Sequence, residues 1–154
     1  MKLTPSTRNK FFLHLVQGEK QLLFELLKLY PRIPPAHYKL SKARLPDHEA
    51  SQQLLDEALT EQRTQNKKQV EALLTDPLRL RETETGCRIA LSRGDVEWLL
   101  QVLNDIRVGS WILLGSPEPK LEVNLLTEKT APDFWAMELA GQIQMRLLSD
   151  LNPR

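Results

Sequence analysis

The stretch WLLQVLNDIRVGSWILLG at residues 98–115 constrains the fold more than any other part of this sequence, because it reads as a helix that is apolar on nearly every side. A helix of that kind either lies at the centre of a protein or contacts two surfaces. Asn104, Asp105 and Arg107 interrupt the apolar run, and Gly109 follows them. An unpaired buried charge costs several kcal/mol, so each charged side chain needs a partner or access to water.

We interpret Asn104, Asp105 and Arg107 as structural residues that form fixed polar pairs in a helical core. Asp105 and Arg107 point in different directions on a helix, so they do not pair with each other. Gly109 costs about 1 kcal/mol relative to Ala in a helix, and we therefore expect another backbone to pass close to it. An active site or a partner-binding surface at this cluster is the alternative.

Four segments carry helix signals and predict the fold class. Leucines share one face of the segment 17–30, and Pro77 follows the segment 47–75. Ser92 and Asp95 form a capping box ahead of the third segment, and Pro132 suits the first turn of the fourth. We expect one mainly α domain over residues 1–154, a bundle of about four principal helices near 17–30, 47–75, 93–114 and 131–151. A proline-rich connection occupies 31–46.

Two short strands are the β-structure that we expect. Cys87, Ile89 and Leu91 alternate with polar residues, which is typical of a short strand or of an extended lead-in. The segment LEVNLL at 121–126 alternates as well, and it could pair with FFLHLV at 11–16 as a minor strand. We find no internal repeat in the sequence.

One face of the helix expected at 47–75 forms a seam of residues spaced alternately four and three positions apart: Leu55, Leu59, Gln62, Asn66, Gln69 and Leu73. The seam is apolar at both ends and carries amide side chains in its middle. A buried amide needs a hydrogen-bond partner. Either the middle of this helix projects into solvent, or its amides pair across a helix–helix contact, within the chain or in a dimer.

Composition favours a soluble cytoplasmic protein. Hydrophobic residues make up 41% of the chain and a single cysteine, Cys87, is present. No apolar run is long enough for a membrane span, so we expect no membrane association. Residues 1–45 hold nine Lys and Arg against two Glu, a net charge of +7, whereas residues 46–154 carry −6. The two halves either pack together or present their charges to partners.

Motifs for catalysis are absent from the sequence. The six glycines are isolated, and three histidines and one cysteine show no metal-ligand spacing. We therefore expect no enzyme activity, no cofactor and no metal.

Our hypothesis for function, a protein-interaction surface, starts from Trp135, because Trp and Arg side chains often make the main contacts at protein interfaces. It shares a predicted helix face with polar residues, and Val108 and Ile112 lie on the far side of the preceding helix. The candidate protein-interaction residues are Trp135, Glu138, Gln142, Arg146, Val108 and Ile112. We expect an unidentified protein partner, with self-association as one form of it. In the alternative interpretation, the loop at 115–129 covers Trp135.

Nucleic-acid binding through the basic first 45 residues is the alternative function. Cations and two tyrosines surround the proline-rich connection, and such residues can follow phosphates and stack on bases. The candidate nucleic-acid residues are Lys28, Arg32, Lys39, Lys42 and Arg44. No recognised nucleic-acid module accompanies them.

The segment 91–115, with an acidic helix start, a Trp, LNDIR and a closing LG, resembles the signature of an uncharacterised bacterial family of helical proteins. The aromatic pair Phe134 and Trp135 near the start of the last helix resembles that family too. Some members are encoded near an adaptor of the Clp protease, so the resemblance implies a link to regulated proteolysis.

Overall fold

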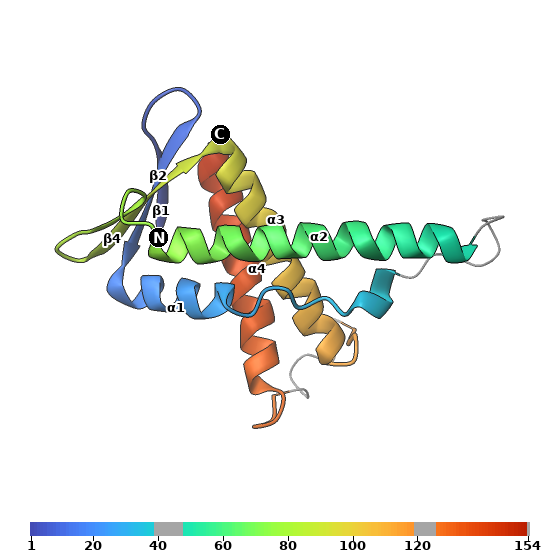
Figure 1. The fold of residues 1–154 in the computed structure, drawn as a ribbon. Coiled ribbons are helices and arrows are strands. Elements are labelled where there is room, and N and C mark those ends of the chain that lie inside the picture. The colour runs from blue at the N-terminus through green and yellow to red at the C-terminus, as the bar shows by residue number, and fades with distance from the viewer. Residues whose placement is uncertain (39–47, 119–125, 154) are drawn as a thin grey trace.

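A four-stranded antiparallel sheet and four α-helices form the chain in the computed structural model, which describes residues 1–38, 48–118 and 126–153 (Figure 1). The strands are β1 (Lys2–Pro5), β2 (Lys10–Val16), β3 (Leu80–Glu82) and β4 (Gly86–Ser92), in the sheet order β1-β2-β4-β3. The helices are α1 (Gln17–Leu27), α2 (His48–Thr75), α3 (Arg93–Leu113) and α4 (Ala131–Leu151), with a short 3-10 helix, η1 (Pro35–Tyr38).

The expected fold class, a mainly α bundle with two short strands, is wrong. The four helices lie close to their expected positions, but 62% helix is accompanied by a sheet that holds 15% of the chain, so the fold is mixed α/β. The strands β1 and β3 have four and three residues, too few to show a period-two pattern. Among the described residues, the strand neighbours of β2 are β1 and β4, and the suggested pairing of 11–16 with 121–126 cannot be followed in the structure. Residues 121–125 lie outside the described residues.

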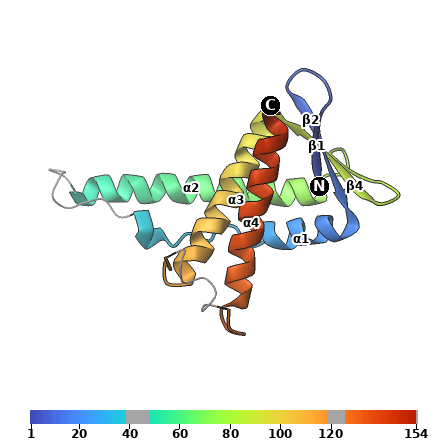
Figure 2. The same ribbon diagram turned by 180° about the vertical axis from the view of Figure 1, so that it is seen from behind.

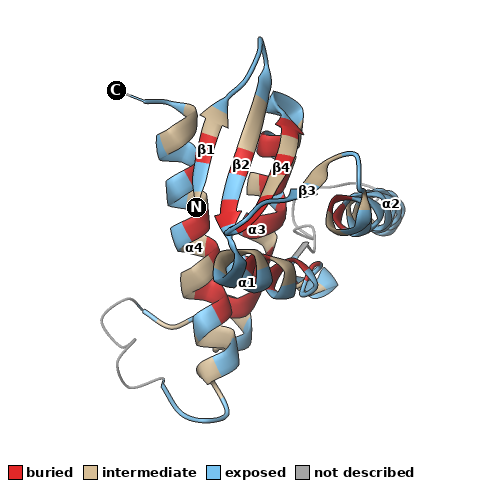
Figure 3. Cartoon of the chain, turned by 90° about the vertical axis from the view of Figure 1, so that its left-hand side faces the viewer, coloured by how far each residue is buried: buried red, intermediate tan, exposed pale blue. Residues whose placement is uncertain are grey.

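One face of the sheet forms the core. Alternate strand residues point inward, and six of these side chains are buried: Leu3, Leu13, Leu15, Cys87, Ile89 and Leu91. The helices α3 and α4 lie behind the sheet in Figure 3, which shows the strands from their open side. The other face of the sheet is therefore not covered by a described helix.

The sheet and the helices that follow it consist of two units of the same kind, a repeat that the sequence analysis missed. Each unit is a β-hairpin whose second strand leads directly into a helix: β1-β2-α1 and β3-β4-α3. Leu13 pairs with Ile89 at the centre of the β2–β4 ladder. Equivalent residues are Leu13 and Ile89, Gly18 and Gly94, Glu19 and Asp95, Leu23 and Leu99, and Leu27 and Leu103.

Both units start their helix in the same way. The backbone N–H of Val16 donates to Glu19 (3.0 Å) and that of Ser92 donates to Asp95 (2.8 Å). The Ser92 hydroxyl also accepts from the Asp95 N–H, which confirms the capping box expected there. The two carboxylates therefore satisfy the backbone donors that the first helical turn leaves free.

Helix α3 is the central helix, as expected. Its side chains Leu99, Val102, Leu103 and Ile106 are fully buried, and α3 contacts α1, β4 and α4. Figure 2 shows α3 and α4 side by side. None of the helices that the structure describes is both long enough and apolar enough to pass through a membrane.

The long helix α2 extends beyond the other elements (Figure 1) and buries only Val70 and Leu73 near its end. At the middle of its polar seam, the Asn66 amide donates to the Tyr30 hydroxyl (3.0 Å) and accepts from the Trp98 indole (3.2 Å). Asn66 is thus paired within the chain, whereas Gln62 and Gln69 are exposed.

Candidate functional site

The polar residues of α3 hold the segment that leaves α1. A carboxylate oxygen of Asp105 accepts from the backbone N–H groups of Arg32 (2.6 Å) and Ile33 (3.3 Å). One helical turn later, a Cβ on Gly109 would lie 2.5 Å from the carbonyl carbon of Arg32. The expectation of a close backbone at Gly109 is confirmed. We call Asp105 and Gly109, together with the Arg32 and Ile33 backbone, the α3 clamp.

The Arg32 side chain extends the clamp to α4. Its guanidinium forms an ion pair with Asp133 in the first turn of α4, and both side chains are largely buried. From the other side, Arg63 of α2 donates to the Ile33 carbonyl (2.6 Å). The segment after α1 is therefore tied to α2, α3 and α4 at once.

Burial raises the pKa of the Asp105 carboxyl above its ordinary value. The hydrogen bonds from the Arg32 and Ile33 backbone and the charge of Arg63 oppose that shift but do not cancel it. The clamp thus contains a carboxyl group whose protonation differs between the folded and unfolded chain.

Asn104 and Arg107 lie at the surface, not in the core where we expected them. Arg107 donates to Asn104 (2.9 Å) and to Gln144 of α4 (3.1 Å), and Gln144 donates back to the Leu100 carbonyl of α3 (3.2 Å). These bonds fasten the outer edges of α3 and α4 together.

A groove of about 270 Å³ lies between α1 and α4. Its floor is apolar, formed by Leu23, Leu139 and Ile143. Leu22, which is 54% exposed, borders it from α1, and Gln142 and Arg146 border it from α4.

Trp135 lies on α4 one turn before Leu139 and is 60% exposed. Its ring meets that of Phe134 edge-on, with centroids 5.7 Å apart. The described part of the loop at 115–129 contacts a different indole, that of Trp111, which donates to the Pro117 carbonyl (3.0 Å). The apolar surface of Trp135 is therefore left accessible.

Charged contacts lie at one side of the groove. The Met1 amino group and the Val16 N–H hold the pKa of Glu19 below its ordinary value. Arg146 also lines the groove and pairs with Asp150 (3.3 Å), which in turn accepts from the Leu3 N–H (2.9 Å). The ion pair of Arg32 and Asp133 lies outside the groove lining and joins the segment after α1 to the start of α4.

The other predicted interaction residues are less accessible. Glu138, Val108 and Ile112 are half-buried, and none of the three borders the groove. The structure thus brings Trp135, Gln142 and Arg146 together on one face of α4. Sequence reasoning missed Leu22, Leu139 and Ile143; Leu22 belongs to the leucine-rich face of 17–30, which we expected to be core.

The two predicted nucleic-acid residues that the structure describes both have acidic partners. Lys28 pairs with Glu25 (2.7 Å) and Arg32 pairs with Asp133. Lys39, Lys42 and Arg44 lie outside the described residues.

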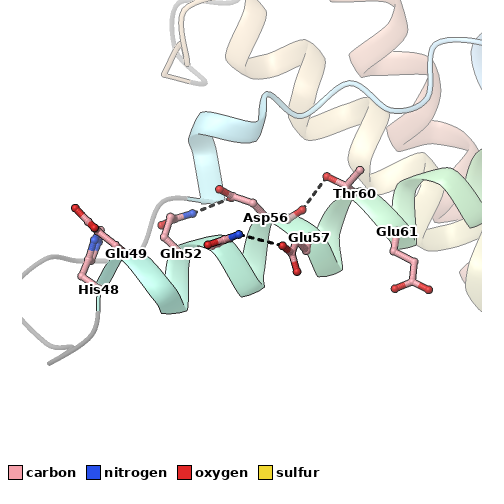
Figure 4. A pocket seen from close by; sticks show the side chains of 8 residues that line it. His48, Glu49, Gln52, Asp56, Glu57, Thr60 and Glu61 are labelled. Carbon is pink, nitrogen blue, oxygen red and sulfur yellow. Dashed lines mark hydrogen bonds between the residues drawn. The ribbon is translucent and has the colours of Figure 1, made fainter.

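A wide hollow of about 770 Å³ lies beside the first half of α2 (Figure 4). The lining residues that the structure describes all belong to this one helix, and they bond to each other, as Gln52 does to Asp56 (2.9 Å) and Gln53 to Glu57 (3.3 Å). One face of a single helix does not enclose a ligand, so we assign no site to these residues.

The described residues offer no evident catalytic group. Burial raises the pKa of the Cys87 thiol, which disfavours the reactive thiolate. No cluster of His, Cys, Asp and Glu suited to a metal ion occurs in the described ranges. Comparison of the chain with protein-family models, curated protein sequences and solved structures finds no match.

Proposed function

We propose that this protein is a non-catalytic interaction protein that binds a partner protein in the groove between α1 and α4. The observation that carries the proposal is the 60% exposed Trp135, which does not line the groove itself but lies on α4 one helical turn before Leu139 of the groove floor. Large aromatic side chains with a polar rim are typical centres of protein interfaces.

An amphipathic helix is the partner structure that suits this groove. Glu19 at the start of α1 lies beside Arg146 near the end of α4, and Arg32 after α1 reaches Asp133 at the start of α4. Figures 1 and 2 show α1 lying across α4, so the groove lies where the two helices cross. The α4 residues that line the groove, Leu139 to Arg146, span about two helical turns, and we therefore expect about two turns of a partner helix to bind there.

The α3 clamp supports this function by fixing the walls. It holds the exit of α1 on α3, and Arg32 joins the same segment to α4. A groove with fixed walls loses less conformational entropy when the partner binds.

The proposal is tested by a photo-crosslinking amino acid at Leu22 of the full chain, incubated with lysate of the source organism. Leu78, 85% exposed and remote from the groove, provides the matched control position. We expect one discrete adduct from Leu22 and none of the same mass from Leu78. An identical adduct from both positions, or none from Leu22, contradicts the proposal.

Trp135→Ala sharpens the test. We expect the Leu22 adduct to disappear, because truncating an interface Trp costs about 2 kcal/mol or more, roughly a 30-fold loss of affinity. The melting temperature should change little, since Trp135 is mostly exposed. An adduct with the mass of two chains identifies the partner helix as belonging to a second copy.

A link to regulated proteolysis forms the second part of the proposal and depends on the family resemblance of 91–115 alone. Mass spectrometry of the Leu22 adduct tests it. A Clp protease subunit or adaptor in the adduct supports the link, and any other protein contradicts it.

A further inference from the structure

A row of four basic side chains crosses the open face of the sheet. The strand register places Lys2 opposite His14, His14 opposite Arg88, and Arg88 opposite Arg81. Residues directly opposite in a sheet point to the same face. With neighbouring strands about 4.8 Å apart, the row is about 14 Å long. Two of its members come from each ββα unit.

The charges of this row are not neutralised within the described part of the chain. Like charges on facing strand positions destabilise a sheet, and no described carboxylate pairs with Lys2, Arg81 or Arg88. The outward positions of the four strands carry no Asp or Glu. Nearby cations on other surfaces do have acidic partners: Lys20 with Glu82, Arg79 with Asp95 and Arg93 with Glu97.

Flat π-systems lie within the row. The Arg88 guanidinium is 4.2 Å from the centroid of the Phe12 ring, which orients its plane. The exposed His14 ring meets Phe12 at 6.4 Å and 62°, and Thr4 Oγ1 lies 3.0 Å from its Nε2. An imidazole and an arginine plane held in this way can each stack on a nucleobase.

We infer that the open face of the sheet binds single-stranded nucleic acid, with phosphates on Lys2, Arg81 and the exposed Lys10 and bases on His14 and Arg88. The site is separate from the groove of the proposed function and from the basic residues predicted by sequence. An acidic peptide would use the cations but would leave the two flat groups without a stacking partner. A duplex fits poorly, because a 14 Å wide sheet face does not enter a major groove about 12 Å wide.

Fluorescence anisotropy of the full chain with a labelled single-stranded oligouridylate of about 12 nucleotides tests the inference. We expect binding that falls with roughly the second power of the salt concentration, as about three neutralised phosphates predict. No binding at low salt, or tighter binding to a duplex of the same length, would overturn the inference.

Charge reversal locates the site. Lys2→Glu combined with Arg81→Glu changes two exposed residues on the edge strands, and we expect affinity to fall roughly tenfold or more with a shallower salt slope. Lys28→Glu is the control, an exposed cation outside this face, and should change affinity by no more than about twofold. Equal losses in both variants would overturn the site. Circular dichroism and melting curves establish that each variant is folded.

Arg88→Lys separates stacking from charge. It keeps the cation but removes the guanidinium plane, so we expect weaker oligonucleotide binding with the same salt slope. Unchanged affinity, or equally effective competition by poly-glutamate, would overturn the inference in favour of an acidic protein ligand.

Discussion

The two ββα units share their strands, their helix start and their inward leucines, but they differ in how the helix ends. In the first unit, α1 stops at Leu27, ahead of Pro31. In the second, the equivalent helix continues to Leu113. The added turns of α3 carry Asp105 and Gly109, which receive the chain as it leaves α1.

This difference explains why the LNDIR stretch carries polar residues. The residues that both units share form the sheet and the core. The residues that only the second unit has, Asp105 and Gly109, join the two units and thereby fix the position of α1 beside α4. Asp105 thus binds a neighbouring backbone, whereas Asn104 and Arg107 join the outer edges of α3 and α4.

Ile106→Asp should give the largest effect. Ile106 is fully buried on α3 and stands at the position equivalent to Tyr30 of the first unit. A buried unpaired carboxylate costs several kcal/mol, about the whole stability of a small domain, so the chain should be unfolded or insoluble. Gln101→Asp, on the exposed face of the same helix, should melt like the parent. Equal tolerance of both variants in melting curves would contradict the central position of α3.

Gly109→Ala should give the next largest effect, a loss of about 1–3 kcal/mol in urea unfolding, because the added Cβ meets the Arg32 backbone. The control is Gly18→Ala in α1, where the new Cβ meets nothing within 4 Å. There we expect a gain of roughly 0.4–1 kcal/mol. If both substitutions stabilise the chain, the close approach at Gly109 does not exist.

Asp105→Asn tests the pH dependence of the clamp. Because the folded pKa of Asp105 is raised, the folded chain binds this proton more tightly than the unfolded chain does. Its contribution is fully present below the unfolded pKa and decreases as pH rises through the folded pKa. The unfolding free energy of the parent minus that of Asp105→Asn should therefore fall as pH rises from below the unfolded pKa through the raised folded pKa. A difference that rises over this range would show the opposite shift.

Ser110→Ala should give the smallest effect. The Ser110 hydroxyl is fully buried and has no hydrogen-bond partner among the described residues. Removing an unsatisfied buried hydroxyl should stabilise the chain by about 1 kcal/mol in urea unfolding. Destabilisation of that size would indicate a hydrogen bond to this hydroxyl.

The sequence predicts the helices well because their signals are local. The capping box at Ser92 and the prolines after 17–30 and 47–75 mark helix ends close to where α1, α2 and α3 have them. Gly109 predicted a neighbouring backbone, because the free-energy cost of Gly in a helix indicates a compensating contact.

The sheet and both candidate surfaces depend on contacts between distant residues. The strand β3 exists because it pairs with β4, and no pattern within three residues reveals that. The basic row joins Lys2 and His14 of the positive half to Arg88 and Arg81 of the negative half. The groove likewise needs Leu22 of α1 beside Ile143 of α4.

Amide hydrogen exchange at Arg32 and Ile33 tests the α3 clamp most directly. In the parent chain we expect both N–H groups to be protected, because Asp105 accepts from each of them. In Asp105→Ala both should exchange rapidly while the amide of Leu27 in α1 stays protected. Rapid exchange of Arg32 and Ile33 in the parent, or unchanged protection in Asp105→Ala, would contradict the clamp.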